Sequence, residues 1–461
     1  MIVQTAQRSL QQQKGRPGLW DHGRYLLWSW WLWTIISIAA AYTDHWGTAI
    51  ATGVTAAFTY LVAPQERSLK YGLDASLPVA STEFLNNVAG TTGAPYMPGN
   101  DVTLLNNGDE FYPEMLAAIR GARLSVTIEA YIYWAGEIGM QFAEALAERS
   151  REGVTVKILL DAVGSSTIGK EILEKLNSAG CEVAWYNPVH WSTVGRYNNR
   201  THRKSLIVDG KVAFTGGAGI ADHWSGRAQD EKHWRDLEIR IQGPGAVPLQ
   251  TGFAQNWVNT TGELVSGPAF FPSIEPAGRI AAQTILSSPE IGSSAVRIMH
   301  YLAIACARHS LYIANAYFLP DNTAVDILID AKKRDVDVKI MVPDEHNDMW
   351  IARYASVKLY GRLLEAGIEI YEYQRTMLHQ KFMTADSAWL TVGTTNFDNR
   401  SFALNEESNV CVYDRRLAGE LERTFYNDLA VCRRVDLESW RKRGLKVRIL
   451  GVLASLLKEQ I

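Results

Sequence analysis

Hydrophobic positions near the start of the chain form two long uncharged runs. The first extends from Tyr25 to Thr43 with four tryptophans near its beginning, and the second, richer in Ala, Thr and Gly, extends from His45 to Gln65. An uncharged run of about 20 residues can cross the ~30 Å hydrocarbon layer of a membrane as a helix. Tryptophans bunched at one end of such a run are typical of a membrane–water interface. The pattern predicts a hairpin of two transmembrane segments over residues 25–65.

Two other interpretations of the first run stay open. It could be a signal peptide, because Arg24 precedes it and Ala39–Ala41 resembles a cleavage site, or it could be a buried core helix. Charge placement favours the hairpin, because basic residues stand on both sides of the pair of runs (Arg8, Lys14, Arg16 and Arg24 before it, Arg67 and Lys70 after it). The positive-inside rule then predicts a multi-pass protein of the cell inner membrane, with a cytoplasmic tail at 1–24 and the part of the chain after residue 65 also in the cytoplasm. If only the first run spans, the same rule sends the rest of the chain outside.

The body of the chain carries the same order of hydrophobic and amphipathic segments twice. In each half a helix-patterned stretch precedes a β-rich run (124–133 and 311–318), and further β-rich runs follow at 154–161 and 181–186, matched by 336–344 and 368–371. This alternation predicts two similar α/β halves, over 99–260 and 261–436. The apolar runs are nearly continuous, so we expect helices on both faces of each sheet. Two such halves imply a pseudo-twofold axis, and a site on that axis takes an equivalent residue from each half.

The flanking segments differ in composition from the repeated body. Residues 66–98 are rich in Ala, Ser, Thr, Gly and Pro and are interpreted as a linker. Residues 437–461 begin with Arg and Lys and continue into an apolar run from Ile449. The pattern fits equally a helix lying on an anionic membrane surface and an ordinary helix docked on the domain.

Composition and charge narrow the class of protein. The chain of 461 residues is 47% hydrophobic and 21% charged, which excludes wholesale disorder. A net charge of −3 gives no general sign of a nucleic-acid binder. The four cysteines are scattered without a C-x-x-C pair, which argues against a disulfide scaffold and against a cysteine-built zinc site.

Each half contains one His-x-Lys-x-x-x-x-Asp sequence. The first runs from His202 through Lys204 to Asp209, and the second supplies three corresponding residues (His379, Lys381 and Asp386). Of the ten histidines, only these two are followed by Lys and Asp at this spacing, and they lie at corresponding places in the repeat. Residues i and i+2 of a strand point to the same face, so each His lies beside its Lys.

This pairing suits a phosphate better than a protein core, where the ammonium would need a partner. The lysines can neutralise non-bridging oxygens, and a neutral imidazole can attack phosphorus. The histidine of the other half can protonate the leaving alcohol and then deprotonate the incoming one. No metal-ligand cluster accompanies the motifs, so we expect no metal and no cofactor.

The paired motifs resemble the HKD motifs of the phospholipase D superfamily, and the surrounding sequence resembles bacterial cardiolipin synthases. The resemblance covers roughly residues 98–436, and its other landmarks are Gly99-Asn100, Glu129-Ala-Tyr131, Trp234-Arg-Asp236, Asn396-Phe-Asp398-Asn-Arg400-Ser401 and Asn405-Glu-Glu407. It implies a phosphohistidine intermediate in a site between two α/β halves, and two N-terminal membrane segments are also typical of these synthases.

Residue by residue, the resemblance implies roles for the motif side chains. His202 would be the nucleophile and His379 the general acid and base. Lys204, Lys381 and Asn396 would hold the phosphoryl oxygens, while Asp236 and Glu407 would orient the imidazoles. For Asp209 and Asp386 a direct catalytic role and a local structural role are equally compatible with the pattern.

One departure from the family pattern concerns the first half. Where the family usually has an Asn after the glycine pair, this chain has Gly219, whereas the second half keeps Asn396. An amide is therefore missing from one side of the expected phosphate cradle.

The resemblance implies a membrane phosphatidyltransferase that makes cardiolipin from two phosphatidylglycerols and releases glycerol. A monomer would suffice for one active site, and no nucleic-acid partner is expected. Three alternatives stay open: a phospholipase D that hydrolyses phospholipids, a nuclease, and a non-catalytic membrane scaffold.

Overall fold

The computed structural model describes residues 30–62, 77–188, 199–289 and 295–456, and it divides into two compact units. The smaller unit holds α3 (Trp30–Tyr42) and α4 (Trp46–Val62), which pack against each other as a helical hairpin. The Ser37 hydroxyl on α3 donates to the carbonyl of Ala49 on α4 at 2.6 Å. The hairpin lies at the predicted position, but none of the described helices has both the length and the apolar character needed to span a membrane. The remaining ends of the predicted segments, 25–29 and 63–65, lie outside the described residues.

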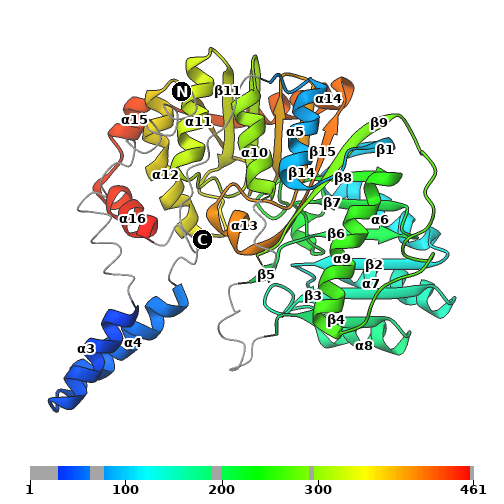
Figure 1. Ribbon diagram of the computed structural model, residues 1–461, viewed down its shortest axis with the longest axis horizontal. Coiled ribbons are helices and arrows are strands. Elements are labelled where there is room, and N and C mark those ends of the chain that lie inside the picture. The colour runs from blue at the N-terminus through cyan, green and yellow to red at the C-terminus, as the bar shows by residue number, and fades with distance from the viewer. Residues whose placement is uncertain (1–29, 63–76, 189–198, 290–294, 457–461) are drawn as a thin grey trace, which may run out of the picture. The chain divides into compact units, whose positions relative to one another are not determined.

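The larger unit contains the predicted repeat, and the main elements follow in the same order in both halves, apart from β5 in the first and α13 and β16 in the second (Figure 1). The first half comprises β1 (Met97–Asn106), α6 (Asn107–Gly121), β2 (Ser125–Ala130), α7 (Glu137–Arg151), β3 (Thr155–Asp161), α8 (Lys170–Ser178), β4 (Glu182–Tyr186), β5 (Arg200–Thr201), β6 (Ser205–Val208), β7 (Val212–Gly216), β8 (Leu237–Gln242) and α9 (Val247–Thr261). The second comprises β9 (Ile280–Ser287), α10 (Ala295–Cys306), β10 (Ser310–Asn315), α11 (Asn322–Lys333), β11 (Asp337–Pro343), α12 (Trp350–Glu365), β12 (Glu369–Tyr373), β13 (Lys381–Ala385), β14 (Trp389–Gly393), α13 (Asn399–Ala403), β15 (Asn405–Tyr413), α14 (Arg415–Leu429) and β16 (Cys432–Val435).

Strand pairing repeats in the same way. β2 is parallel to β3 and antiparallel to β6, and β10 is parallel to β11 and antiparallel to β13. The hairpins β6–β7 and β13–β14 then continue antiparallel into β8 and β15. Because β1 pairs with both β8 and β9, the two sheets join into one hydrogen-bonded run of strands. The predicted α/β repeat is therefore confirmed.

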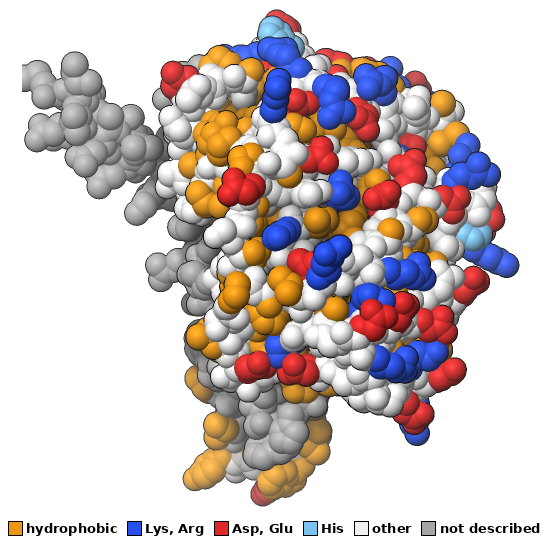
Figure 2. Space-filling view, turned by 90° about the vertical axis from the view of Figure 1, so that its right-hand side faces the viewer, with side chains coloured by type: hydrophobic (Ala, Val, Ile, Leu, Met, Phe, Trp, Pro, Cys, Tyr) orange, Lys and Arg blue, Asp and Glu red, His pale blue; other side chains and the backbone are white. Residues whose placement is uncertain are grey.

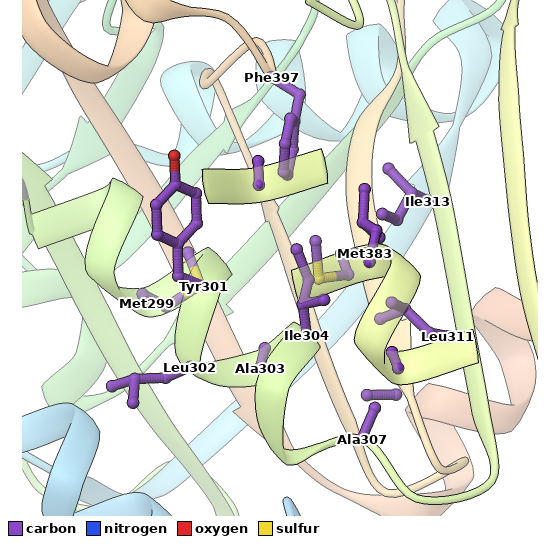
Figure 3. Close-up of a cluster of buried hydrophobic side chains, with 14 of the residues drawn as sticks. Met299, Tyr301, Leu302, Ala303, Ile304, Ala307, Leu311, Ile313, Met383 and Phe397 are labelled. Carbon is purple, nitrogen blue, oxygen red and sulfur yellow. The ribbon is translucent and has the colours of Figure 1, made fainter. Parts of the chain in front are cut away.

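Helices cover both faces of each sheet, as expected, and on one face the other sheet contributes as well. One apolar cluster lies under α6, α7 and α8 on the first sheet, and another lies under α10, α11 and α12 on the second. Figure 3 shows part of the second cluster, where Ile304 of α10 lies between Met299 of the same helix and Leu311 of β10. The opposite faces of the two sheets meet in a shared cluster that also takes in α9 and α14. A continuous apolar strand shows burial on both faces, but it cannot tell a covering helix from a covering sheet.

The predicted linker at 66–98 contains a packed helix, α5 (Thr82–Thr92), in its described part. Ser81 caps it by accepting from the amide of Phe84, and Gly93 ends it in the left-handed conformation at φ 73°. Phe84 and Val88 are fully buried in the cluster under α10. Only two large apolar residues, one helical turn apart, stand among the small and polar residues of this segment, so the sequence pattern did not indicate a helix.

The C-terminal segment forms two helices, α15 (Leu437–Arg441) and α16 (Leu445–Leu456), and α16 packs on α12. On the side of the molecule turned to the viewer in Figure 2, basic and acidic side chains are interspersed. That face therefore carries no single-sign surface of the kind that binds nucleic acid.

Candidate active site between the two halves

The two motif histidines lie between short strands that cross from one half to the other. β5, which leads into His202, pairs with the beginning of β15 in the second half. Leu378, just before His379, pairs in turn with Arg235 in the first half. The backbone amide of each histidine donates across this junction, from His202 to Glu406 and from His379 to Arg235. These backbone bonds place His202 beside Glu407, the residue after Glu406, and His379 beside Asp236, the residue after Arg235.

Each imidazole is held by the carboxylate of the opposite half. Nδ1 of His202 lies 3.0 Å from Oε1 of Glu407, and Nδ1 of His379 lies 2.8 Å from Oδ2 of Asp236. Both carboxylates are fully buried, and Thr394 donates a further hydrogen bond to Glu407 at 2.5 Å. A carboxylate on Nδ1 fixes the tautomer that carries its proton there, which leaves Nε2 with a lone pair.

The two lysines lie in the same buried group. Nζ of Lys204 donates to the carbonyl of His202 at 3.0 Å, and Nζ of Lys381 donates to the carbonyl of His379 at 2.6 Å. Both lysine side chains are buried, with relative exposures of 5% and 2%. Burial, together with repulsion between the two cations, lowers the pKa of Lys204 to about 7. Burial also lowers the pKa of Lys381 to about 8.

The surroundings of the two histidines are not equivalent. Nζ of Lys381 lies 3.1 Å from Nε2 of His379, whereas no residue that the structure describes is hydrogen-bonded to Nε2 of His202. Burial lowers the pKa of both imidazoles, to about 4 for His202. In the site without substrate, therefore, His202 is the neutral imidazole, and its Nε2 has no hydrogen-bond partner among the described residues.

Aromatic side chains line the two imidazoles. The Tyr131 ring lies 5.3 Å from the His202 ring, and the Tyr317 ring lies 6.5 Å from the His379 ring. His379 also contacts Trp234 at 5.5 Å and Trp224 at 5.4 Å between ring centroids.

Trp224 is a site residue that the sequence reasoning did not identify. It lies in the short 3₁₀ helix Asp222–Trp224, is fully buried, and donates from its indole Nε1 to Oδ2 of Asp236 at 2.8 Å. That oxygen also faces Nδ1 of His379. No local pattern marks Trp224, because its contact with Asp236 is created by the fold.

Trp224 also accounts for the departure at Gly219. A Cβ built on Gly219 would lie 2.9 Å from Cβ of Ile132 and 3.0 Å from the Trp224 ring. The space for an asparagine side chain is thus taken by Ile132 and Trp224 together. The neighbouring Gly217 is required for a similar reason, because a Cβ there would lie 2.2 Å from Oδ1 of Asp236.

The other predicted phosphate ligand, Asn396, is buried two residues beyond Thr394, which contacts Glu407. Its backbone amide donates to the hydroxyl of Ser401 at 3.2 Å, and its side-chain oxygen has no hydrogen-bond partner among the described residues.

The motif carboxylates Asp209 and Asp386 lie at the other end of the strands from the histidines. Asp209 accepts from three consecutive backbone amides, at Arg123, Leu124 and Ser125. Asp386 accepts in the same way from the amides of residues 308–310. Both have positive φ, 52° and 54°, at the tips of the hairpins β6–β7 and β13–β14. The structure thus brings together the histidines, lysines, Asp236 and Glu407, but not these two residues.

A cavity of about 850 Å³ adjoins His379 through Trp234. It takes residues from both halves, including Asp222, His223 and Met377. His346 at its rim lies between Asp344 and Glu231, which ties the second half to a loop of the first. The cavity is large enough to admit an alcohol or a lipid headgroup.

Comparison with known proteins agrees with this geometry. A family model described as "Cardiolipin synthase, PLD-like domain" matches residues 115–235 and 302–429. Cardiolipin synthase 2 of Staphylococcus epidermidis is 32% identical over 361 residues, which cover 78% of this chain and 74% of that protein. The cardiolipin synthase of Clostridium perfringens strain 13 is 36% identical over 364 residues, with 77% and 75% covered.

Among solved structures, the phosphatidylserine synthase of Haemophilus influenzae Rd KW20 matches with a TM-score of 0.65 and 13% identity, over 82% of this chain and 100% of that one. At this identity the match concerns the fold alone. The duplicated family match, the curated relatives and the paired His–Lys motifs agree, and the chain belongs to the cardiolipin synthase family of proteins with phospholipase D-like domains.

Proposed function

We propose that the chain is a membrane phosphatidyltransferase that makes cardiolipin from two phosphatidylglycerols and releases glycerol. The observation that carries the proposal is the crosswise pairing of His202 with Glu407 and of His379 with Asp236, beside two buried lysines. This arrangement offers one imidazole to bond phosphorus and a second to move a proton. The curated names of the relatives supply the substrate class.

In the first step Nε2 of His202 attacks the phosphorus of one phosphatidylglycerol, and the bond from phosphorus to the glycerol oxygen breaks. His379 enters this step as the imidazolium, which Asp236 and the negatively charged phosphate favour, and it gives its Nε2 proton to that oxygen, so that glycerol leaves as a neutral alcohol. In the second step His379 takes the proton from a free hydroxyl of another phosphatidylglycerol. The hydroxyl oxygen then bonds to phosphorus and His202 is released.

The charged and polar neighbours have supporting roles in this proposal. Lys204, Lys381 and Asn396 hold the non-bridging oxygens, and the phosphate provides the counter-charge that the buried lysines need. Asp236 and Glu407 keep the tautomers in which Nε2 reacts. The open Nε2 of His202 supports its assignment as the nucleophile. We assign Asp209 and Asp386 to the strand hairpins rather than to the reaction.

Product analysis tests the reaction. Purified full-length protein is given phosphatidylglycerol with a labelled headgroup, and we expect cardiolipin and free glycerol in equal amounts. Activity should persist in EDTA, because the lysines supply the positive charge. Phosphatidic acid as the main lipid product would instead establish the hydrolytic alternative, and a requirement for a divalent ion would overturn the assignment of the lysines.

Adduct analysis tests the roles of the histidines. With a nitrophenyl phosphatidyl ester, whose leaving group departs unprotonated, His379→Ala should form the phosphatidyl adduct on His202 and accumulate it. His202→Ala should form none. Mass spectrometry of the quenched protein locates the adduct. An adduct on His379 would reverse the two roles, and no adduct in an active enzyme would exclude the covalent mechanism.

The proposal includes anchoring at the cell inner membrane through residues 25–65, with the catalytic part in the cytoplasm. The helical hairpin α3–α4 at that position supports it. One chain contributes both histidines, so a monomer suffices for one site. The reciprocal contacts of the two halves support a pseudo-twofold relation between them.

A further inference from the structure

The C-terminal helix α16 presents different residues to α12 and to solvent. Against α12 it places small residues: Gly451 is buried where a Cβ would lie 3.2 Å from the carbonyl of Tyr354, and Ala454 is buried beside Ala352 and Ala355. Lys358 of α12 also donates to the hydroxyl of Ser455 at 2.7 Å. In Figure 1 the two helices lie side by side at the edge of the second half. Packing against α12 therefore explains why α16 has small residues on one side, but it does not explain the large apolar residues of this helix.

The large apolar residues of α16 lie on its outer face. Leu445, Ile449, Val452 and Leu453 have relative exposures of 71%, 51%, 51% and 54%. Their spacing of i, i+4, i+7 and i+8 puts them on one stripe of the helix. A contiguous apolar stripe in solvent is a mark of an interaction surface rather than of ordinary surface composition.

The neighbourhood of the stripe adds cations and an aromatic ring. Lys446 and Arg448 are exposed on the same helix, and Arg443 just before it lies 3.7 Å over the Trp440 ring. At the start of α12, Trp350 is 59% exposed, and its ring is 6.2 Å from that of Tyr354, the residue that backs Gly451. We define the docking surface as the four stripe residues together with Trp350, Lys446 and Arg448.

The docking surface adjoins the active-site cavity. His346, Asn347 and Asp348 line the cavity, and Trp350 lies two residues after Asp348 in the chain. The hydroxyl of Tyr317, whose ring contacts His379, donates to Asp348 at 2.5 Å. A partner bound at the docking surface would thus lie next to the cavity that adjoins His379.

We propose that the docking surface lies on an anionic lipid bilayer, with the stripe of α16 and Trp350 among the headgroups and upper acyl chains. Apolar residues in one stripe with Lys and Arg beside them are the pattern of helices that lie in the membrane interface. A second copy of this chain fits less well, because a symmetric contact would bring Lys446 and Arg448 against their own copies. The proposal rests on the proposed function only in taking phospholipid as the partner.

The test uses full-length protein in vesicles of phosphatidylglycerol and phosphatidylcholine. An environment-sensitive fluorophore is attached at Val452→Cys, in a Cys432→Ser background because the other three cysteines are buried. Nitroxides on the lipid acyl chains should quench this label several-fold more than the same label at Leu264→Cys. Leu264 is the matched control, since it is 72% exposed and lies just beyond α9, in the segment that connects the two halves. Equal quenching at the two positions, or none at 452, would overturn the proposal.

A second measurement concerns turnover. The double change Ile449→Asp and Leu453→Asp should lower the initial rate on vesicle lipid at least several-fold and leave the rate on monomeric short-chain lipid unchanged, whereas Leu264→Asp should affect neither. Equal loss on both substrates would contradict bilayer docking. Cross-linking of Val452→Cys between copies without lipid quenching would assign the surface to a second copy. The quenching readout needs no turnover, so failure of the docking and failure of the proposed function are distinguishable.

Discussion

Two buried lysines beside two buried histidines give the site a dependence on pH at the level of single residues. A lysine whose pKa is lowered by burial is charged below that pKa and loses its charge as the pH rises through it. For Lys204 and Lys381 this happens at about 7 and about 8 in the free protein. Burial lowers the pKa of His202 to about 4, so that the proposed nucleophile stays neutral throughout this range.

We therefore predict that affinity for phosphatidylglycerol falls as the pH rises from 7 to 9, by up to about tenfold per unit above the lysine pKa. The measurement is the dissociation constant of a short-chain lipid for the inactive His202→Ala protein. In that background Lys204→Arg should lose less affinity by pH 9, because the guanidinium at 204 stays charged while Lys381 still titrates at about 8. Affinity that does not change with pH would show that the lysines do not hold the phosphate.

Trp224 is predicted to position Asp236 and, through it, His379. Trp224→Phe removes the indole N–H that Asp236 accepts, and the loss of one hydrogen bond to a buried charge should lower the turnover number roughly 10- to 100-fold. Adduct formation with the nitrophenyl ester should be unchanged, because that step needs no acid. Trp257→Phe is the matched control, since Trp257 is equally buried and donates to Glu263 away from the site. Equal losses on both substrates would mean a structural role only.

The sequence predicted the residues of the site but not their partners. The repeated spacing identified His202, Lys204, His379 and Lys381, and the resemblance supplied Asp236 and Glu407. That each carboxylate contacts the histidine of the other half depends on the pairing of β5 with β15 and of Leu378 with Arg235. Such contacts join residues more than 140 positions apart, and no local pattern records them.

At the level of elements, the spacing from His to Asp, which is the same in both motifs, reflects the length of one strand. β6 and β13 begin at or just after the motif lysines, and each ends at an Asp whose carboxylate binds the backbone amides that precede β2 or β10. The Asp thereby fastens the hairpin tip to the neighbouring strand, and at its positive φ it also makes the tight turn.

We predict that Asp209→Ala and Asp386→Ala each lower the free energy of unfolding by about 1–3 kcal/mol, because three backbone amides lose their hydrogen bonds to a charged acceptor. Turnover per folded molecule should stay within about twofold. Denaturant unfolding and active-site titration measure the two quantities. A large loss of turnover with unchanged stability would instead show a direct catalytic role for the motif carboxylates.

The strands and helices also show what the hydrophobic periodicity of the sequence can and cannot predict. β-rich runs at 154–161 and 336–344 correspond to β3 and β11, because burial on both faces leaves an unbroken apolar pattern. α5 was missed, because a helix whose buried face is only Phe84 and Val88 has a weak pattern among Ala, Ser, Thr and Gly. Its position is set by packing under α10.

At the scale of the whole molecule, the pairing of β1 with both β8 and β9 makes the two halves one body. The active site requires that the two halves be joined, because the carboxylate that is hydrogen-bonded to each histidine comes from the other half. A substrate at the histidines therefore contacts both halves at once, and the orientation of this body relative to the membrane decides which leaflet supplies it.

Orientation in the membrane is predicted from charge alone, since the basic flanks of residues 25–65 lie outside the described residues. Basic residues stand on both flanks and the turn between the two runs carries only Asp44 and His45, so both flanks should be cytoplasmic. Reporter domains fused after Lys14 and after Lys70 should therefore both be active on the cytoplasmic side. The matched control inserts the reporter in the turn after Asp44, where it should be exported. An exported reporter at Lys70 together with a cytoplasmic one at Lys14 would mean that only the first run spans, and that the active site faces the opposite side of the membrane.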